Sequence, residues 1–177
     1  MINDIETILF SDEDLKSIVE RLGKEISNDY KDKNLVLVSV LKGSVVFMAD
    51  LMRAITVPCV IDFMSVSSYG AATQSSGVVN IKKDLERSIE GENVIIVEDI
   101  IDSGNTLSRL MKLFETRNPK TITICTLLDK PDRREVDDVK ADYTGFVIPD
   151  KFVVGFGLDY DQRFRNLPYI GFVEGEI

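Results

Sequence analysis

The sequence contains no histidine. This absence excludes the Ser-His-Asp and Cys-His triads, metal sites built on imidazole, and proton transfer by a histidine side chain. Any catalysis must therefore use carboxylates, lysine, tyrosine or hydroxyl groups.

Cysteine is scarce as well, because Cys59 and Cys125 are the only two. Each lies in an apolar, β-branched run, where a small buried side chain is the expected role. We assign neither cysteine a chemical function.

No segment approaches the roughly 18 uninterrupted apolar residues that a transmembrane helix needs. Residues 1–15 are acidic and have neither the basic region nor the long apolar region of a secretory signal. We therefore expect a cytoplasmic protein with no membrane partner.

Basic residues are in deficit: 30 acidic residues stand against 21 basic ones, for a formal net charge of -9. Nucleic acid binding needs a basic face, so we expect no nucleic acid partner. The 177 residues, 44% hydrophobic and 29% charged, are typical of one globular domain that can bury its own core.

Apolar residues at helical spacing follow Ser11 and three acidic residues, which predicts an N-capped amphipathic helix. Residues 35–40 favour a strand buried on both faces, residues 45–54 a helix, and residues 58–66 a second strand. A helix between two apolar strands implies a parallel crossover connection.

The same alternation continues along the chain. Residues 94–98 are the most strand-like segment, and a helical pattern follows over residues 107–117. Further strands are expected at residues 78–82, 121–128, 143–147, 152–155 and 169–173. The pattern favours an α/β fold with a mostly parallel, twisted sheet flanked by helices. Residues 67–77, which are small and polar, form the one long loop.

The candidate site lies where the strand over residues 94–98 ends. Ligands bind at the carboxyl ends of strands in an open parallel sheet, and Glu98 and Asp99 stand at that end. Their mutual repulsion needs relief from solvent, a bound cation or a polyhydroxyl ligand. The alternative is a solvated strand end with no ligand.

A candidate anion site follows directly. Residues 102–106 have the sequence Asp-Ser-Gly-Asn-Thr, which supplies two hydroxyls, a glycine that permits close approach, and backbone amides at the start of the next helix. The alternative is an Asp or Ser helix cap with no ligand. Other phosphate motifs fail, since no GxxxxGK[ST] occurs and Gly155-Phe156-Gly157 lacks the third glycine of a dinucleotide motif.

Residues 94–106 combine an apolar strand, an acidic pair, two aliphatic residues and Asp-Ser-Gly-Asn-Thr. This combination resembles the signature of the phosphoribosyltransferases that use phosphoribosyl pyrophosphate. Over nearly the whole chain the sequence is similar to the bacterial hypoxanthine-guanine members of that family. The resemblance implies the type I phosphoribosyltransferase fold, in which the single domain of residues 1–177 carries a small hood formed by its N- and C-terminal segments.

The resemblance implies a reaction in purine salvage. The 5-phosphoribosyl group would pass from phosphoribosyl pyrophosphate to N9 of a 6-oxopurine base, hypoxanthine or guanine, giving IMP or GMP and pyrophosphate, with magnesium as cofactor. Glu98 and Asp99 would face the ribose hydroxyls, and Asp102 would be the catalytic acid/base near purine N7. Capping of the next helix is the alternative role for Asp102.

Further binding roles are carried over from the family in the same way. The 5-phosphate would be bound by Ser103, Gly104, Asn105 and Thr106, and pyrophosphate by Arg165 and by Leu41, Lys42 and Gly43, with a cis peptide between Leu41 and Lys42. The base would be bound by Lys130 at its exocyclic oxygen and by Phe152 and Val153 at its ring, and magnesium by Glu98, Asp99 and Asp159. A mobile loop at about residues 67–77 would contribute Ser68 and Tyr69. On composition alone, Phe152 favours the core and Lys130 the surface.

Three alternatives remain open at this point. One is a sister enzyme acting on xanthine and guanine, and another is a non-catalytic regulator that senses phosphoribosyl pyrophosphate and binds RNA. A third alternative is an inert module that binds magnesium or a nucleotide and releases no pyrophosphate. The missing basic face argues against the regulator. By resemblance we expect a homodimer or homotetramer.

Overall fold

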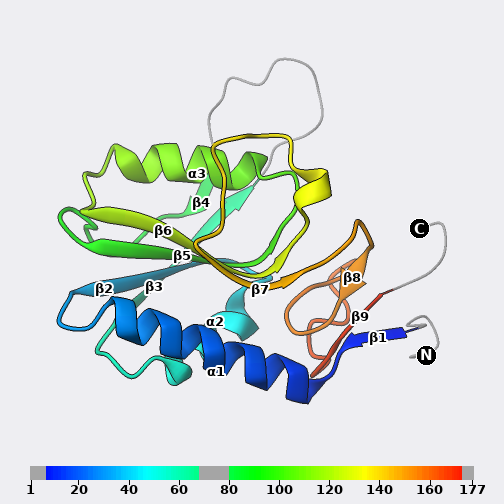
Figure 1. Cartoon of the computed structure of the whole chain (residues 1–177). Coiled ribbons are helices and arrows are strands. Elements are labelled where there is room, and N and C mark those ends of the chain that lie inside the picture. Colours follow the sequence, from blue (N-terminus) through cyan, green and yellow to red (C-terminus); the bar gives the residue numbers. More distant parts are fainter. Residues whose placement is uncertain (1–6, 68–79, 173–177) are drawn as a thin grey trace.

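The computed structural model describes residues 7–67 and 80–172, and the larger of the two sheets in them has six strands (Figure 1). Its strands, in the order β4-β3-β2-β5-β6-β7 across the sheet, are β2 (Leu35–Val40), β3 (Val60–Ser67), β4 (Asn80–Lys83), β5 (Asn93–Ile101), β6 (Thr121–Asp129) and β7 (Tyr143–Val147). The helices are α1 (Asp12–Asp29), α2 (Val45–Ala54), α3 (Asn105–Glu115) and the short 3-10 turn η1 (Pro131–Arg133).

The larger sheet is mostly parallel, as the sequence predicts. β2 pairs in parallel with β3 and with β5, and β6 joins β5 to β7 in the same direction. Only the edge strand β4 runs antiparallel to its neighbour β3 within the described part of the sheet. The loop expected at residues 67–77 lies almost wholly outside the described residues, and so do Ser68 and Tyr69.

Helices cover both faces of this sheet. Figure 1 shows α3 on one face and α1 with α2 on the other. Successive residues of β2 point to opposite faces: Leu35 and Leu37 pack into the core under α1 and α2, whereas Val36 and Val38 pack into the core under α3. Burial on both faces explains why the strand sequences are continuous apolar runs.

Strands are present where residues 152–155 and 169–173 were expected to form them, but they are shorter than expected and lie outside the larger sheet. They shorten to β8 (Val153–Val154) and β9 (Ile170–Phe172), which form a separate antiparallel sheet with β1 (Thr7–Phe10). The chain turns immediately after β8 at Gly155, whose φ is 100°. A Cβ on Gly155 would lie 2.0 Å from the carbonyl oxygen of Tyr169, so this turn needs glycine.

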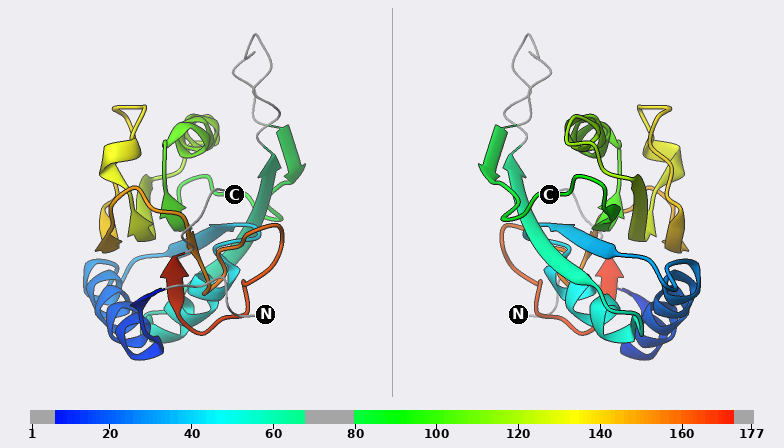
Figure 2. Two further views of the ribbon diagram at one scale, coloured as in Figure 1. Left: turned by 90° about the vertical axis from the view of Figure 1, so that its right-hand side faces the viewer. Right: turned by 90° about the vertical axis from the view of Figure 1, so that its left-hand side faces the viewer.

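The small sheet lies near the carboxyl ends of the parallel strands. In Figure 1 it lies beyond the end of the larger sheet to which the carboxyl ends of β2 and β5 point. It therefore covers the end of a parallel sheet at which ligand sites occur. Figure 2 shows the same arrangement from two further sides.

The cysteines have the surroundings expected from the sequence. Burial raises the pKa of Cys125, which is fully buried in β6, and to a lesser extent that of the half-buried Cys59. A raised pKa disfavours the reactive thiolate. Among the described helices, none is both long and apolar enough to cross a membrane.

Ser11 caps α1, as predicted. Its Oγ accepts a hydrogen bond from the backbone N–H of Asp14 at 3.2 Å, and the Asp14 carboxylate accepts one from the Ser11 N–H at 2.9 Å. This reciprocal pair is a capping box, which satisfies two amides that have no partner within the helix.

We expect Ser11→Ala to lower the free energy of unfolding by about 1 kcal/mol, because the amide of Asp14 loses its acceptor. Urea unfolding measures the change. Ser17→Ala is the matched control, since Ser17 is exposed in the interior of the same helix and its replacement should leave stability unchanged or slightly higher. Equal losses in the two variants would contradict the capping role.

Candidate active site

A cavity of about 280 Å³ opens at the carboxyl ends of the parallel strands. It is lined by the residues that follow β2, by the end of β3, and by one continuous segment from the end of β5 into α3. The lining residues are Val40, Leu41, Gly43, Val66, Glu98, Asp99, Ile100, Ile101, Asp102, Ser103, Gly104, Thr106 and Leu107. The acidic pair and the Asp-Ser-Gly-Asn-Thr segment thus face one space.

The acidic pair is half-buried in the wall of the cavity rather than fully solvated at the strand end. Burial, and then the neighbouring charge of Asp99, raises the pKa of Glu98 well above its usual range. Burial also raises the pKa of Asp99 from 3.8 to about 6. Both shifts mean that the folded protein disfavours two charges here unless a cation or hydrogen-bond donors compensate them.

The Gly43 backbone lies directly against the Asp99 carboxylate. A Cβ on Gly43 would be 1.7 Å from Asp99 Oδ2, so no larger residue fits without displacing that side chain. The peptide between Leu41 and Lys42 is cis, in agreement with the expectation. The Ser44 hydroxyl, hydrogen-bonded to the Val40 carbonyl at 2.5 Å, holds the other end of this turn.

The start of α3 differs from the start of α1. Its N-cap is Gly104, with φ 83°, and no side chain in the described structure caps it. Asp102 is therefore not the N-cap of α3, whereas Ser103 satisfies one amide there, because its Oγ accepts a hydrogen bond from the Asn105 N–H at 3.4 Å. The amides of α3 that follow Asn105 have no side-chain acceptor in the described structure, and the helix dipole favours an anion beside them.

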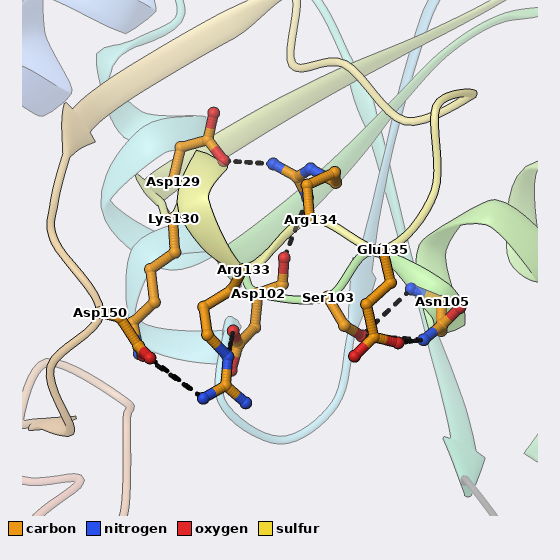
Figure 3. Close-up of polar contacts among 9 residues, drawn as sticks. All are labelled: Asp102, Ser103, Asn105, Asp129, Lys130, Arg133, Arg134, Glu135 and Asp150. Carbon is orange, nitrogen blue, oxygen red and sulfur yellow. Dashed lines mark hydrogen bonds and ion pairs between the residues drawn. The ribbon is translucent and has the colours of Figure 1, made fainter.

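The turn before α3 is held from one side by the segment after η1. The Asn105 amide donates to Glu135 Oε2 at 2.5 Å, and the Glu135 N–H donates to the Ser103 carbonyl at 2.9 Å (Figure 3). A Cβ on Gly104 would meet the Val136 side chain at 2.8 Å. This packing fixes the position of the turn, of which Ser103, Gly104 and Thr106 line the cavity.

The segment over residues 155–165 packs against the turn after β2. A Cβ on Gly157 would lie 2.0 Å from the Gly43 carbonyl, and Lys42 Nζ donates to Gln162 Oε1 at 3.1 Å. Arg165 forms an ion pair with Asp159 at 2.7 Å and donates to the Gly157 carbonyl at 2.7 Å.

The same segment brings charge to the acidic pair. Arg165 lowers and Asp159 raises the pKa of Asp99, so both stand close enough to act on it through their charges. The structure therefore brings together Lys42, Asp99, Asp159 and Arg165, which lie far apart in the sequence.

The residues expected to contact a base have surroundings that composition did not predict. Lys130 is only 6% exposed and lies 3.7 Å from an Asp150 carboxylate oxygen, so it is not a surface lysine. Phe152 is 43% exposed and packs edge-on against Tyr160, with ring centroids 5.8 Å apart, so it is not a core residue. Val153 is buried in β8.

Asp102 occupies the boundary between the cavity and these residues. Its Oδ1 is buried and, within the described structure, accepts no hydrogen bond, although Arg133 Nε lies 3.2 Å away. The Arg133 guanidinium is near enough for charge attraction but is not aligned to donate. An unpaired buried acceptor is costly, and such atoms mark places where a ligand or water supplies the partner.

Sequence reasoning missed several residues around the site. Gln162, Asp150, Arg133 and Glu135 all contact residues that it named. The signal that could have found two of them is the charged run over residues 130–135, directly after a buried strand.

The donors fit magnesium, but they do not form a complete metal cage. Within residues 7–67 and 80–172, no three carboxylate, histidine or cysteine side chains gather closely enough to hold a metal ion. Glu98, Asp99 and Asp159 offer only oxygen donors. Magnesium keeps several waters and is usually bound through one or two carboxylates together with substrate phosphates, so these residues suit a metal that arrives with its substrate.

The family model of the phosphoribosyl transferase domain matches residues 8–161. The chain therefore belongs to the phosphoribosyltransferase family. Within that family it groups with hypoxanthine-guanine phosphoribosyltransferases: it is 54% identical to the enzyme of that name from Bacillus subtilis over 97% of this chain and 94% of that protein.

Two further relatives agree. A hypoxanthine phosphoribosyltransferase structure from Staphylococcus aureus superposes with a TM-score of 0.93 at 48% identity, covering 97% of this chain and 93% of that one. The bifunctional protein TilS/HprT of Listeria monocytogenes is 50% identical over the whole chain, and this chain spans 27% of its length. The expected family and type I fold are confirmed.

We expect Asp99→Asn to stabilise the folded protein at pH 7. The folded state keeps a proton on Asp99 up to about pH 6, whereas the unfolded chain releases it near pH 3.8. Stability therefore falls as the pH rises through this window and stays lower above it. An asparagine has no proton to lose, so the variant should gain on the order of 2 kcal/mol at pH 7 and little at pH 4.

Urea unfolding at pH 4 and pH 7 measures this effect. Asp84→Asn is the control of opposite sign, because two hydrogen bonds from Arg117 lower the pKa of Asp84. That variant should lose stability at pH 7. If the Asp99→Asn variant were less stable than the wild type at pH 7, the charged Asp99 carboxylate would not destabilise the folded protein, and the prediction would be wrong.

Proposed function

We propose that this chain transfers a 5-phosphoribosyl group from phosphoribosyl pyrophosphate to N9 of hypoxanthine and of guanine. The observation that carries this proposal is one cavity lined both by the half-buried carboxylates Glu98 and Asp99 and by the glycine turn at the start of α3. The two ends of a sugar phosphate need surfaces of different chemistry, carboxylates for the sugar hydroxyls and N–H donors for the phosphate. Sugar hydroxyls donate to carboxylates, whereas a phosphate would be repelled by them and binds where N–H groups converge.

The sugar end of the proposed substrate lies on Glu98 and Asp99. Their raised pKa values favour hydroxyl donors or a cation as partners. Magnesium, when bound with the substrate near these carboxylates and Asp159, neutralises negative charge on the departing pyrophosphate. Lys42 and Arg165 bring positive charge to the same side of the cavity, against the net charge of -9 of the whole chain.

The phosphate end lies on Ser103, Gly104, Asn105 and Thr106. Gly104 has a positive φ, and Ser103, Gly104 and Thr106 line the cavity. With both ends fixed, the anomeric carbon is held for in-line attack, and positioning of this kind contributes a large part of rate enhancement.

The base end lies toward Lys130, Phe152 and Val153. Lys130 is a donor and therefore suits the exocyclic oxygen of a 6-oxopurine rather than the amino group of adenine. The exposed Phe152 ring is available to stack on the base. Asp102 accepts the proton at N7 through the oxygen that has no hydrogen bond in the described structure.

The test of the function is a spectrophotometric screen with phosphoribosyl pyrophosphate, magnesium and each of hypoxanthine, guanine, xanthine and adenine. We expect turnover of hypoxanthine and guanine with release of pyrophosphate. Xanthine as a preferred substrate would favour the sister enzyme. Adenine as the sole acceptor, or RNA binding without turnover, would overturn the proposal. The oligomeric state stays a prediction, which sedimentation in solution can measure.

We expect Asp102→Asn to lower kcat for hypoxanthine by about 100-fold or more, because the amide cannot take the proton from N7. The fold should persist, since Gly104 and not Asp102 is the N-cap of α3. Steady-state kinetics and thermal unfolding measure both effects. Asp132→Asn removes the same charge from an exposed neighbour and should leave kcat unchanged. A kcat within twofold of the wild type would remove Asp102 from the mechanism.

A further inference from the structure

Four charged side chains form an alternating chain beside the cavity (Figure 3). Lys130 Nζ lies 3.7 Å from Asp150 Oδ1, Asp150 Oδ2 lies 3.2 Å from Arg133 Nη1, and Arg133 Nε lies 3.2 Å from Asp102 Oδ1. Arg133 therefore links the residue proposed to handle the proton with the residue proposed to recognise the base. The chain of contacts crosses from the start of α3 to the segment before β8.

The Arg133 side chain uses its fork geometry to bridge two carboxylates. Nε faces Asp102 while Nη1 faces Asp150. A lysine ammonium is a single point charge and cannot replace both contacts at these positions. Asp150, and then Asp102, raise the pKa of Arg133, so the guanidinium stays charged.

The backbone that carries Arg133 is tied at both ends. The Arg133 N–H donates to the Lys130 carbonyl at 3.1 Å, and the Lys130 N–H donates to the Ile101 carbonyl at 2.9 Å. The next residue, Arg134, pairs with Asp129 and donates to the Asp102 carbonyl at 3.3 Å. The turn η1 is thus anchored to the end of β5, which also carries Asp102.

The chain of charges differs from a surface salt bridge because one of its members, Lys130, is nearly buried. A buried ammonium needs a nearby counter-charge. Asp150, about half exposed, supplies that charge and would be free to rotate away without Arg133. Asp102 keeps an oxygen without a hydrogen bond although Arg133 stands beside it, so that oxygen is held in place and still free to meet a donor on a ligand.

We propose that Arg133 is a positioning residue that holds Asp102 and, through Asp150, Lys130 in fixed positions relative to each other for the proposed purine. This inference rests on the proposed function. It adds that proton transfer and base recognition are coupled through one arginine outside the cavity.

The test is the steady-state kinetics of Arg133→Leu with hypoxanthine and phosphoribosyl pyrophosphate. We expect kcat to fall about tenfold and the KM for hypoxanthine to rise severalfold, since displacement of a reacting group by a fraction of an ångström costs this much. The KM for phosphoribosyl pyrophosphate should stay within twofold, because Arg133 touches no residue assigned to the sugar phosphate. Arg133→Lys should recover only part of the loss.

Arg21→Leu is the matched control. Arg21 is also about half exposed and also joins two elements, pairing with Glu25 at 2.7 Å and donating to the Thr144 carbonyl at 2.6 Å. Its loss should lower the melting temperature and leave kcat and both KM values unchanged. A merely structural role for Arg133 predicts the same behaviour for both variants.

A double-mutant cycle with Asp150→Asn tests the route to Lys130. Asp150→Asn alone should raise the KM for hypoxanthine, and adding Arg133→Leu should raise it little further, because both changes break one chain of contacts. Fully additive effects would overturn the inference. So would an active wild-type enzyme whose Arg133→Leu variant matches it in kcat and KM. A wild-type enzyme that uses no 6-oxopurine overturns the proposed function itself, and the inference with it.

Discussion

The confinement of two carboxylates at the end of β5 is the constraint on which the rest of the site depends. Glu98 and Asp99 are placed at a cavity wall where burial raises both pKa values. The chain approaches them with a glycine backbone at Gly43, which leaves the Asp99 oxygens facing the cavity. A fold that keeps this destabilising arrangement is prepared for a ligand that supplies hydroxyl donors and a cation.

The other charged and polar groups around the cavity lie where they can compensate the charges of Glu98 and Asp99. Arg165 and Lys42 approach from two different segments, and the 155–165 segment is held against the turn after β2 by the close approach of Gly157 to Gly43. At the opposite end, α3 starts without a side-chain cap, unlike α1 with its capping box at Ser11. The contrast between the two helices separates an end built for stability from an end built for binding.

Much of this was accessible from the sequence. The order of strands and helices followed from apolar periodicity, and the site segment followed from an acidic pair and a glycine turn after the most apolar strand. The signature over residues 94–106 is local, so it can be recognised in the sequence without any knowledge of tertiary contacts. The sequence did not predict which strands pair in the small sheet, because that pairing joins segments far apart along the chain. β8 and β9 are too short to be distinguished by pattern from strands of the larger sheet, and β1 was not expected at all.

The sequence alone determined the α/β class, the family and the residues of the glycine turn before α3, because each depends on neighbours along the chain. Only the tertiary structure decided that Lys130 is buried, that Phe152 is exposed, and that Arg133 stands between Asp102 and Asp150. These facts depend on which segments meet after the sheet has formed. Burial and charge pairing depend on contacts between segments that are distant in the sequence, so no single stretch of sequence contains both partners.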